Sequence, residues 1–84
     1  MSLRIVRRTD VQKILGVSRS TTYDRQRAGL LPPPINLGGR AVGWLLLEIN
    51  ELAWAFINGW PEDKIKALVL MFIEVRKMDV KNVQ

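Results

Sequence analysis

The sequence predicts a mainly α-helical fold with a small β-hairpin, arranged as a winged helix-turn-helix head plus an additional C-terminal amphipathic helix. Three observations predict it: two short helical patterns joined by a three-residue turn, a glycine pair between two extended runs, and two further helical patterns after them. The 84 residues are enough for one small core. We expect residues 1–59 to form the head. Residues 60–84 are expected to form the C-terminal helix, which packs on the head or mediates dimerisation.

Caps and stop signals predict the first two helices. Thr9 begins a capping-box pattern followed by apolar residues at helical spacing, and Gly16 ends that pattern. Ser18 is a suitable N-cap for a second helix, which Gly29 ends in the left-handed conformation. The short turn between Gly16 and Ser18 is typical of a helix-turn-helix.

The residues after the second helix predict the hairpin. Three consecutive prolines, residues 32–34, hold the backbone extended. Two short extended runs then flank Gly38 and Gly39, which is the pattern of a tight hairpin turn. A hairpin in this position is a wing, with Arg40 at or near its tip. We expect Trp44 in the core, where it anchors the returning strand.

Two more helices are predicted in the C-terminal half. Apolar residues recur at helical spacing over residues 46–58, and Gly59 stops the pattern. Pro61 then opens a longer helix that reaches about Met78, with acids at its start and bases near its end, as the helix dipole favours. Residues 79–84 are expected to fray.

The composition argues against enzymes and metal proteins. The chain has no cysteine and no histidine, which removes thiolate and imidazole metal ligands and the usual general base. The carboxylates, Glu48 among them, fall at helix starts or on solvent faces, where dipole and solubility roles suffice. We therefore expect no enzymatic activity, no cofactor and no metal. With no apolar secretory segment and no apolar run of about 20 residues, we expect a cytoplasmic protein without membrane contact.

Positive charge is concentrated in one half of the chain. Residues 1–47 hold eight Lys and Arg against two acids, a net charge of +6, whereas residues 48–84 hold five bases and six acids, a net charge of −1. Seven of the eight bases in the first half are arginines, whose guanidinium suits bidentate contacts with phosphate or guanine. This asymmetry favours a surface that faces a polyanion, although from charge alone solubility explains it equally well.

Three motifs carry a family resemblance. The chain has Ser-Arg-Ser-Thr-Thr-Tyr at residues 18–23, Ala-Gly-Leu-Leu-Pro at 28–32 and Leu-Gly-Gly-Arg-Ala-Val-Gly-Trp at 37–44. Together they resemble the AlpA family of prophage regulators, over roughly residues 5–57. That family is similar to excisionases and to the DNA-binding head of MerR-type regulators. The resemblance therefore implies a winged helix-turn-helix that acts on the genes of mobile elements.

Two features depart from the family pattern. The second helix has Thr22, Arg25 and Gln26 on its inward face, where the family has an aliphatic residue at the first position and often at the others. Such a helix either packs more loosely or uses the arginine stem and the threonine methyl group as apolar cover. The second departure is the helix from Pro61 onward, which many short members of the family lack.

The predicted DNA-binding residues come from the second helix, the wing and the start of the first helix. One face of the second helix is expected in the major groove, the wing tip at a minor groove or phosphate, and the residues beside the first helix at phosphates. These residues are Arg19, Ser20, Tyr23, Arg27, Gly39, Arg40, Arg7 and Arg8. Asp24 lies on the same face, where pairing with Arg27 is preferred over contact with a cytosine. Tyr23 is expected to pack in the core with its hydroxyl near a phosphate.

The last helix has a broad apolar face that a three-helix head does not obviously cover. The face consists of Ile65, Leu68, Val69, Phe72 and Ile73. It either forms a homodimer contact or folds back to enlarge the core, and the sequence supports both equally.

Together these observations predict a sequence-specific double-stranded DNA-binding transcriptional regulator of a prophage or other mobile element. An alternative is an excisionase, or recombination directionality factor, which bends DNA at attachment sites and works with an integrase or other recombinase through the same surface. A third reading, from another class, is a protein-interaction or inhibitor module that uses the C-terminal helix, against which the basic first half argues.

Overall fold

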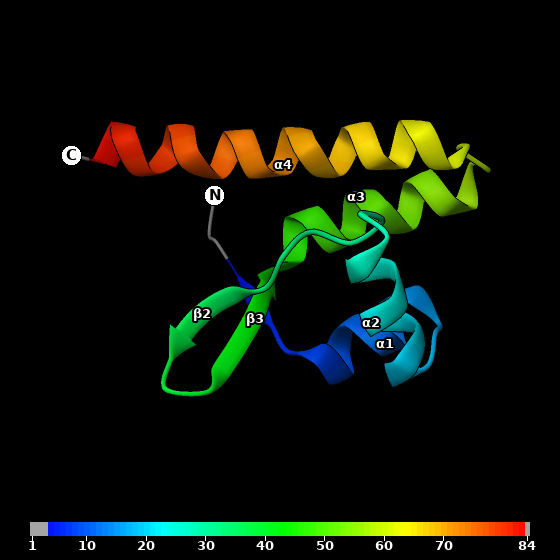
Figure 1. The fold of residues 1–84 in the computed structure, drawn as a ribbon, viewed down its shortest axis with the longest axis horizontal. Helices are drawn as coiled ribbons and strands as arrows, with labels where there is room; N and C mark the ends of the chain where they lie inside the picture. The colour runs from blue at the N-terminus through cyan, green and yellow to red at the C-terminus, as the bar shows by residue number, and fades with distance from the viewer. Residues whose placement is uncertain (1–3, 84) are drawn as a thin grey trace.

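The computed structural model describes residues 4–83, with side chains up to Met78. Along the chain the elements are β1 (Ile5–Val6), α1 (Arg8–Leu15), α2 (Arg19–Arg27), β2 (Ile35–Gly38), β3 (Ala41–Leu45), α3 (Leu46–Ile57) and α4 (Glu62–Val83). The predicted fold class is confirmed, because α1, α2 and the β2–β3 hairpin form a winged helix-turn-helix head and a long helix follows it (Figure 1).

The cap predicted for α1 is wrong by two residues. Arg7 is the N-cap, and its backbone N–H donates to the Asp10 carboxylate at 3.0 Å, while the Asp10 N–H donates to the Arg7 carbonyl at 2.9 Å. Thr9 lies inside the helix. A carboxylate at the third helical position is a charged acceptor close to the free N–H groups of the first turn, which favours the earlier start. The predicted stop is confirmed, with Gly16 at a φ of 67°.

The caps predicted for α2 are confirmed. Ser18 has an extended backbone, and its hydroxyl oxygen accepts from the Thr21 N–H at 3.2 Å. Gly29 follows the helix with a φ of 79°, a conformation that costs glycine little. These two residues set the length of α2, which therefore begins with Arg19 and ends at Arg27.

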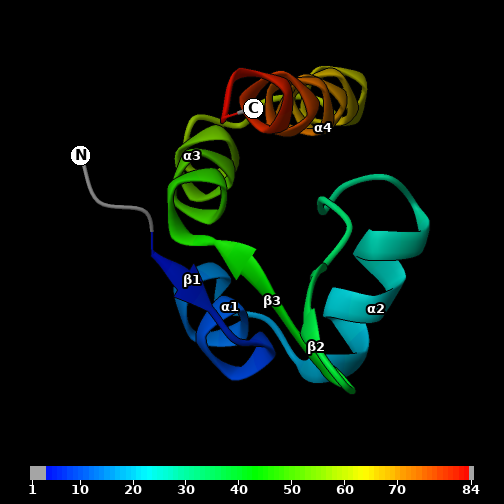
Figure 2. The ribbon, with the colours of Figure 1, turned by 90° about the vertical axis from the view of Figure 1, so that its left-hand side faces the viewer.

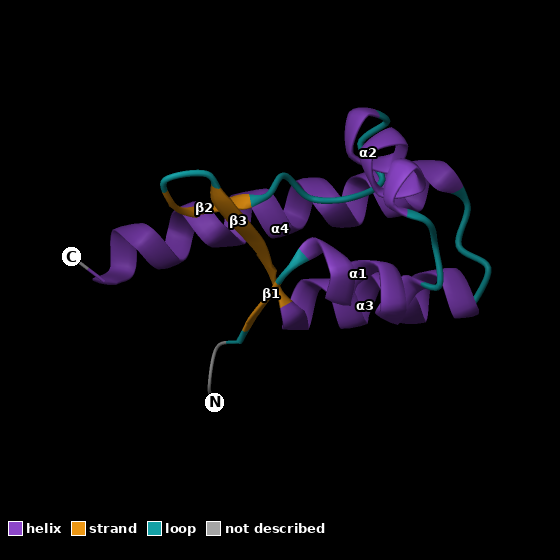
Figure 3. Cartoon of the chain, turned by 90° about the horizontal axis from the view of Figure 1, so that it is seen from below, coloured by secondary structure: helices purple, strands orange, loops and turns teal. Residues whose placement is uncertain are grey.

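The sheet has a third strand that the sequence analysis did not predict. The strand order is β1-β3-β2, with both pairs antiparallel (Figure 3). β1 pairs Ile5 with Leu45 and Val6 with Trp44, which ties the start of the chain to the returning strand of the wing. Two residues are too few to show an alternating pattern, and only a long-range pairing makes them a strand.

One apolar core holds the molecule together. Trp44 is fully buried in it, as predicted, and the indole N–H donates to the Pro32 carbonyl at 2.8 Å. The wing is therefore anchored at its returning strand and at the proline segment before it. The other buried apolar residues come from β1, α1, the proline segment, α3 and α4: Val6, Val11, Leu31, Ile49, Leu52, Ala55, Ile65, Val69 and Phe72.

The C-terminal helix α4 folds back onto this core. Of the five residues predicted for oligomerisation, Ile65, Val69 and Phe72 are buried in the chain's own core, and Leu68 and Ile73 pack against it. They cover α3 and the head, so the fold-back alternative describes this structure. Figures 1 and 2 show α4 lying across α3, on the side away from α1 and the hairpin.

A buried ion pair holds α4 in place. The Arg76 guanidinium donates to both oxygens of Glu48, at 2.6 and 3.0 Å, and to the Pro33 carbonyl at 2.9 Å. Glu48 was expected at a helix start, which is correct, but it is buried there and not at a solvent face. The backbone of α4 is helical to Val83, beyond the predicted end at Met78, and Gln84 lies outside the described residues.

Candidate DNA-binding surface

The start of α1, the helix α2 and the wing together line a shallow cleft of about 500 Å³. Its lining residues are Arg7, Arg8, Thr9, Arg19, Tyr23, Arg40 and Val42. Four of these seven are arginines, and none of the described residues that line it is acidic. Four arginines that lie between positions 7 and 40 of the sequence are thus gathered on one concave surface, which is the arrangement that attracts a polyanion. We call this surface the arginine cleft.

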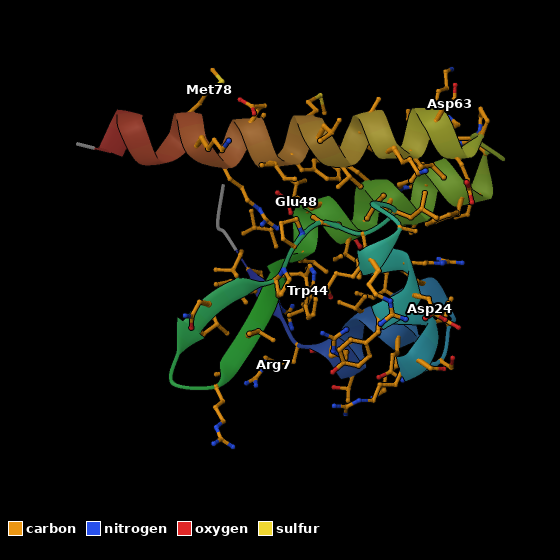
Figure 4. All side chains as sticks on the ribbon, viewed as in Figure 1. Arg7, Asp24, Trp44, Glu48, Asp63 and Met78 are labelled. Atoms are coloured by element: carbon orange, nitrogen blue, oxygen red, sulfur yellow. The ribbon has the colours of Figure 1, made fainter. Side chains whose placement is uncertain are left out.

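The fold places α2 and the wing on the same side of α1. Figures 2 and 3 show both elements projecting from the same side of α1. Figure 4 shows Arg7 between the hairpin and the helices. Arg19 and Arg40, which are 21 positions apart in sequence, therefore both face the arginine cleft.

The first turn of α2 presents its polar side chains to solvent. The Ser18 cap starts the helix at Arg19, so Arg19 and Ser20 both lie in the first turn and are exposed. The Arg19 guanidinium donates to the Tyr23 hydroxyl at 3.3 Å. A helix N-terminus also offers free backbone N–H groups and a positive dipole end, which suit a phosphate. This turn carries the groups that a recognition helix needs for bases and backbone.

Arg8 lies at the floor of the cleft and contacts the protein itself. Its guanidinium donates to the Thr22 hydroxyl at 2.9 Å and to the Gln26 side-chain oxygen at 3.5 Å. Its central carbon lies 3.8 Å from the centroid of the Tyr23 ring and 4.8 Å from that of Trp44. The sequence predicts a phosphate contact for Arg8, but in the structure these two donors and both ring contacts are made within the protein.

The polar inward face of α2 is packed, but through hydrogen bonds and a guanidinium–ring contact, which neither of the two alternatives for this helix named. Thr22 is fully buried, and its hydroxyl accepts from Arg8. The Arg25 guanidinium lies over the Phe56 ring of α3, 4.5 Å from its centroid. Hydrogen bonds and a guanidinium–ring contact thus take the place of aliphatic contacts on this face.

The wing ends in a tight glycine turn. Gly38 and Gly39 have φ values of 109° and 55°, which residues other than glycine rarely adopt. The Gly38 N–H donates to the Asn36 side-chain oxygen at 2.9 Å. Arg40 follows directly in the turn and is exposed. The predicted position of Arg40 at the wing tip is confirmed.

Comparisons with known proteins relate the chain to a family. Residues 4–55, more than half of the chain, match the family described as "Prophage CP4-57 regulatory protein (AlpA)". The chain belongs to the AlpA family. A relative described as "Uncharacterized protein ORF88", from Enterobacteria phage P4, is 43% identical over 51 residues, which are 61% of this chain and 56% of that protein. The match thus spans just over half of the relative's length, and no solved structure matches the chain.

AlpA is a family of phage regulatory proteins, and its matched segment contains the whole arginine cleft. The segment runs from β1 to near the end of α3 and leaves α4 outside. The AlpA resemblance proposed from three sequence motifs is confirmed by this match.

The structure brings most of the predicted site residues of this AlpA protein together. Arg7, Arg8, Arg19, Tyr23 and Arg40 line one cleft, with Ser20 beside Arg19 and Gly39 beside Arg40. The prediction that Tyr23 packs in the core is wrong, since the residue is 37% exposed and its ring is contacted by the Arg8 and Arg19 guanidiniums, whose central carbons lie 3.8 and 5.8 Å from the ring centroid.

Arg27 is the predicted site residue that does not line the cleft. It forms the expected ion pair with Asp24, and both side chains are exposed near the C-terminal end of α2. Two lining residues, Thr9 and Val42, were missed. Thr9 was assigned to a cap, and Val42 carries no charge that would mark it as a site residue.

Two further findings concern chemistry and membranes. Within residues 4–78, no three acidic side chains come close enough together to hold a metal ion. No helix in the described part of the chain is both long and apolar enough to span a membrane.

Proposed function

We propose that this AlpA-family protein is a sequence-specific double-stranded DNA-binding regulator of transcription in a prophage or related mobile element. One observation supports the proposal above the others. Arg19 of α2 and Arg40 of the wing face the same concave, arginine-lined surface, so one duplex can contact both. Membership of a family of phage regulatory proteins supports the biological setting.

The proposed binding mode follows from the dimensions of B-DNA. The major groove is about 12 Å wide and admits one α-helix, so α2 enters it with its first turn toward the bases. Arg19 and Ser20 then reach base edges. Arg40 extends from the wing to the adjacent minor groove or a phosphate, and Arg7 meets the phosphate backbone at the rim of the cleft. Arg27, at the C-terminal end of α2, contacts the DNA backbone if its ion pair with Asp24 breaks.

The test measures the affinity of the protein for two short DNA duplexes over a series of salt concentrations. One duplex has a random sequence, and the other is a site that the protein selects from a randomised library. The double variant Arg19→Ala/Arg40→Ala is expected to lose about 100-fold in affinity for the selected site and about two units of salt slope, because two phosphate or base contacts disappear. The matched control is Lys64→Ala/Lys77→Ala, which removes the same charge from exposed positions on α4 and should change neither quantity. Unchanged affinity in a folded Arg19→Ala/Arg40→Ala protein would refute the proposal.

The same assay separates the proposal from its alternatives. Strong bending of a circularly permuted fragment over spaced tandem sites would assign the protein as a recombination directionality factor. Duplex binding without a steep salt dependence would favour a protein-interaction module.

Homodimerisation through α4 is part of the proposal, because two heads on neighbouring half-sites multiply specificity. The residues first predicted for that contact are internal, so a dimer needs the outer side of α4. The exposed apolar residues there are Leu70, Met71, Val75 and Met78, and Figure 4 shows Met78 directed away from the head. Sedimentation of the free protein and of its complex with the selected site measures the stoichiometry.

A regulator of this kind acts in the cytoplasm. An integrase or other recombinase partner would be detected as a second protein bound with this one on an attachment site.

A further inference from the structure

Arg8 joins the two elements that face the DNA. It is the first residue of α1, and α1 packs against both α2 and β3. We infer that Arg8 is a positioning residue for DNA recognition: it holds α2 and the wing at the separation at which both reach one duplex. The inference rests on the proposed function and assigns to Arg8 a role other than phosphate contact.

On the side of α2, Arg8 is linked to the backbone of the recognition turn. Its guanidinium donates to the Thr22 hydroxyl at 2.9 Å, and that hydroxyl donates in turn to the Arg19 carbonyl at 2.5 Å. A hydroxyl can accept and donate at once, so both bonds exist together. The chain of bonds ends at the residue that we place against the bases. The bond to Gln26, one turn further, adds a second point of attachment to the same helix.

On the side of the wing, Arg8 contacts a ring that cannot move freely. The Trp44 ring centroid lies 4.8 Å from its guanidinium carbon, and Trp44 is fully buried in β3 with its indole N–H bonded to the Pro32 carbonyl. The Tyr23 ring of α2 lies 3.8 Å from the same carbon. One planar cation therefore stacks on aromatic rings from both DNA-facing elements.

Only arginine has the geometry for this set of contacts. The guanidinium is planar, with donors in a fixed fork and faces that stack on rings, whereas a lysine ammonium is a point charge without a plane. The bonds to Thr22 and Gln26 fix the orientation of the Arg8 guanidinium against the protein. Arg7, one residue earlier, is exposed at the rim of the cleft and is the better placed phosphate ligand.

A charge-conserving substitution distinguishes positioning from phosphate contact. Arg8→Lys keeps the charge but loses the fork and the stacking. We expect the ratio of affinities for the selected site and the random duplex to fall by about tenfold, with the salt slope unchanged. Arg4→Lys, at an exposed position outside the arginine cleft, is the matched control and should keep the ratio. Two results together would overturn the inference: Arg8→Lys folds and keeps the affinity ratio, and Arg8→Met loses about one unit of salt slope on both duplexes.

A double-mutant cycle tests the route through Thr22. Arg8→Met and Thr22→Val each leave one polar partner unpaired inside the protein, whereas the double variant replaces both with apolar groups. The double variant should therefore retain more of the affinity ratio than the product of the two single losses predicts. Losses that simply multiply would contradict this route. The double variant also keeps the test available if Arg8→Lys does not fold.

A measurement without DNA separates this inference from the proposed function. Because the chain has no cysteine, spin labels can be attached at Ala28→Cys, at the end of α2, and at Arg40→Cys, on the wing tip. The distribution of distances between the labels should broaden or shift in Arg8→Lys and stay unchanged in Arg4→Lys. An unchanged distribution in Arg8→Lys would overturn the positioning role. A wild-type protein that binds no duplex would contradict the proposed function, whatever the label distances show.

Discussion

Gly43 shows how one residue allows the sheet to close. It lies in β3, opposite Ile35 and beside β1, and it has an ordinary backbone conformation, so no special φ requires glycine there. What requires it is space: a Cβ at this position would lie 2.5 Å from the Ile5 side chain and 2.9 Å from the Val6 carbonyl. The glycine of the family motif is therefore needed for close approach of a neighbouring strand.

Gly43→Ala should destabilise the protein by about 1–3 kcal/mol, because β1 must shift to relieve the overlap. The measurement is the midpoint and slope of urea unfolding. Gly39→Asn is the control, since nothing lies within 4 Å of a Cβ there and asparagine tolerates the left-handed conformation. A Gly43→Ala protein as stable as Gly39→Asn would show that β1 does not pack as described.

At the scale of elements, α4 is held by contacts that differ from those of a surface helix. Its Arg76 bonds to Glu48 of α3 and to the carbonyl of Pro33, which precedes the wing. The two side chains of the pair are 19% and 6% exposed. The pair between Glu74 and Lys77, within α4, has a separation of 3.6 Å and side chains that are 68% and 66% exposed. The two pairs differ in burial and so should differ in energy.

Arg76→Met should lower the free energy of unfolding by about 2–4 kcal/mol, because Glu48 is left buried without its cation. Glu74→Ala, which breaks the exposed pair, should change it by less than about 0.5 kcal/mol. Chemical denaturation of both variants measures the difference. Arg76→Met/Glu48→Gln is expected to recover part of the loss, and equal small effects of the two single variants would contradict a structural role for the buried pair.

At the scale of the whole molecule, the arginine cleft and α4 lie on opposite sides of the core. The arginine cleft lies on the side of α1, α2 and the wing, and α4 closes the core on the other side of α3 (Figures 1 and 2). The family match ends at residue 55, yet three of the buried core residues belong to α4. In this member of the family the head therefore shares its core with a segment outside the matched region.

Phe72→Ala tests whether α4 completes a single core. We expect a loss of about 3–5 kcal/mol, measured at a concentration at which the protein is monomeric, because Phe72 is buried within one chain. Met71→Ala, at the exposed neighbouring position, should change stability by less than about 0.5 kcal/mol in the monomer. A Phe72→Ala protein that loses no more stability than Met71→Ala would show instead that α4 adds little to the core.

Much of the candidate site could be predicted from the sequence, and its arrangement could not. Arg19, Ser20 and Arg40 followed from the helix start at Ser18 and from the glycine turn, both of which are local. The direction of the Arg8 side chain depends on Thr22, Gln26 and Trp44, which lie 14 to 36 positions away along the chain. No spacing pattern connects residues so distant, and a basic pair beside a helix indicates phosphate contact by default.

By itself, the sequence determined the helix caps at Ser18, Gly16 and Gly29, the glycine turn of the wing, the burial of Trp44 and the basic character of one half of the chain. These depend on backbone sterics, periodicity and composition, which act over a few residues at a time. Tertiary structure alone decided that β1 joins the sheet, that Arg8 turns inward and that α4 buries its apolar face within the chain. Each of these depends on contacts between segments that are distant in the sequence. Burial and hydrogen bonding stabilise such contacts only once the complete fold brings the segments together.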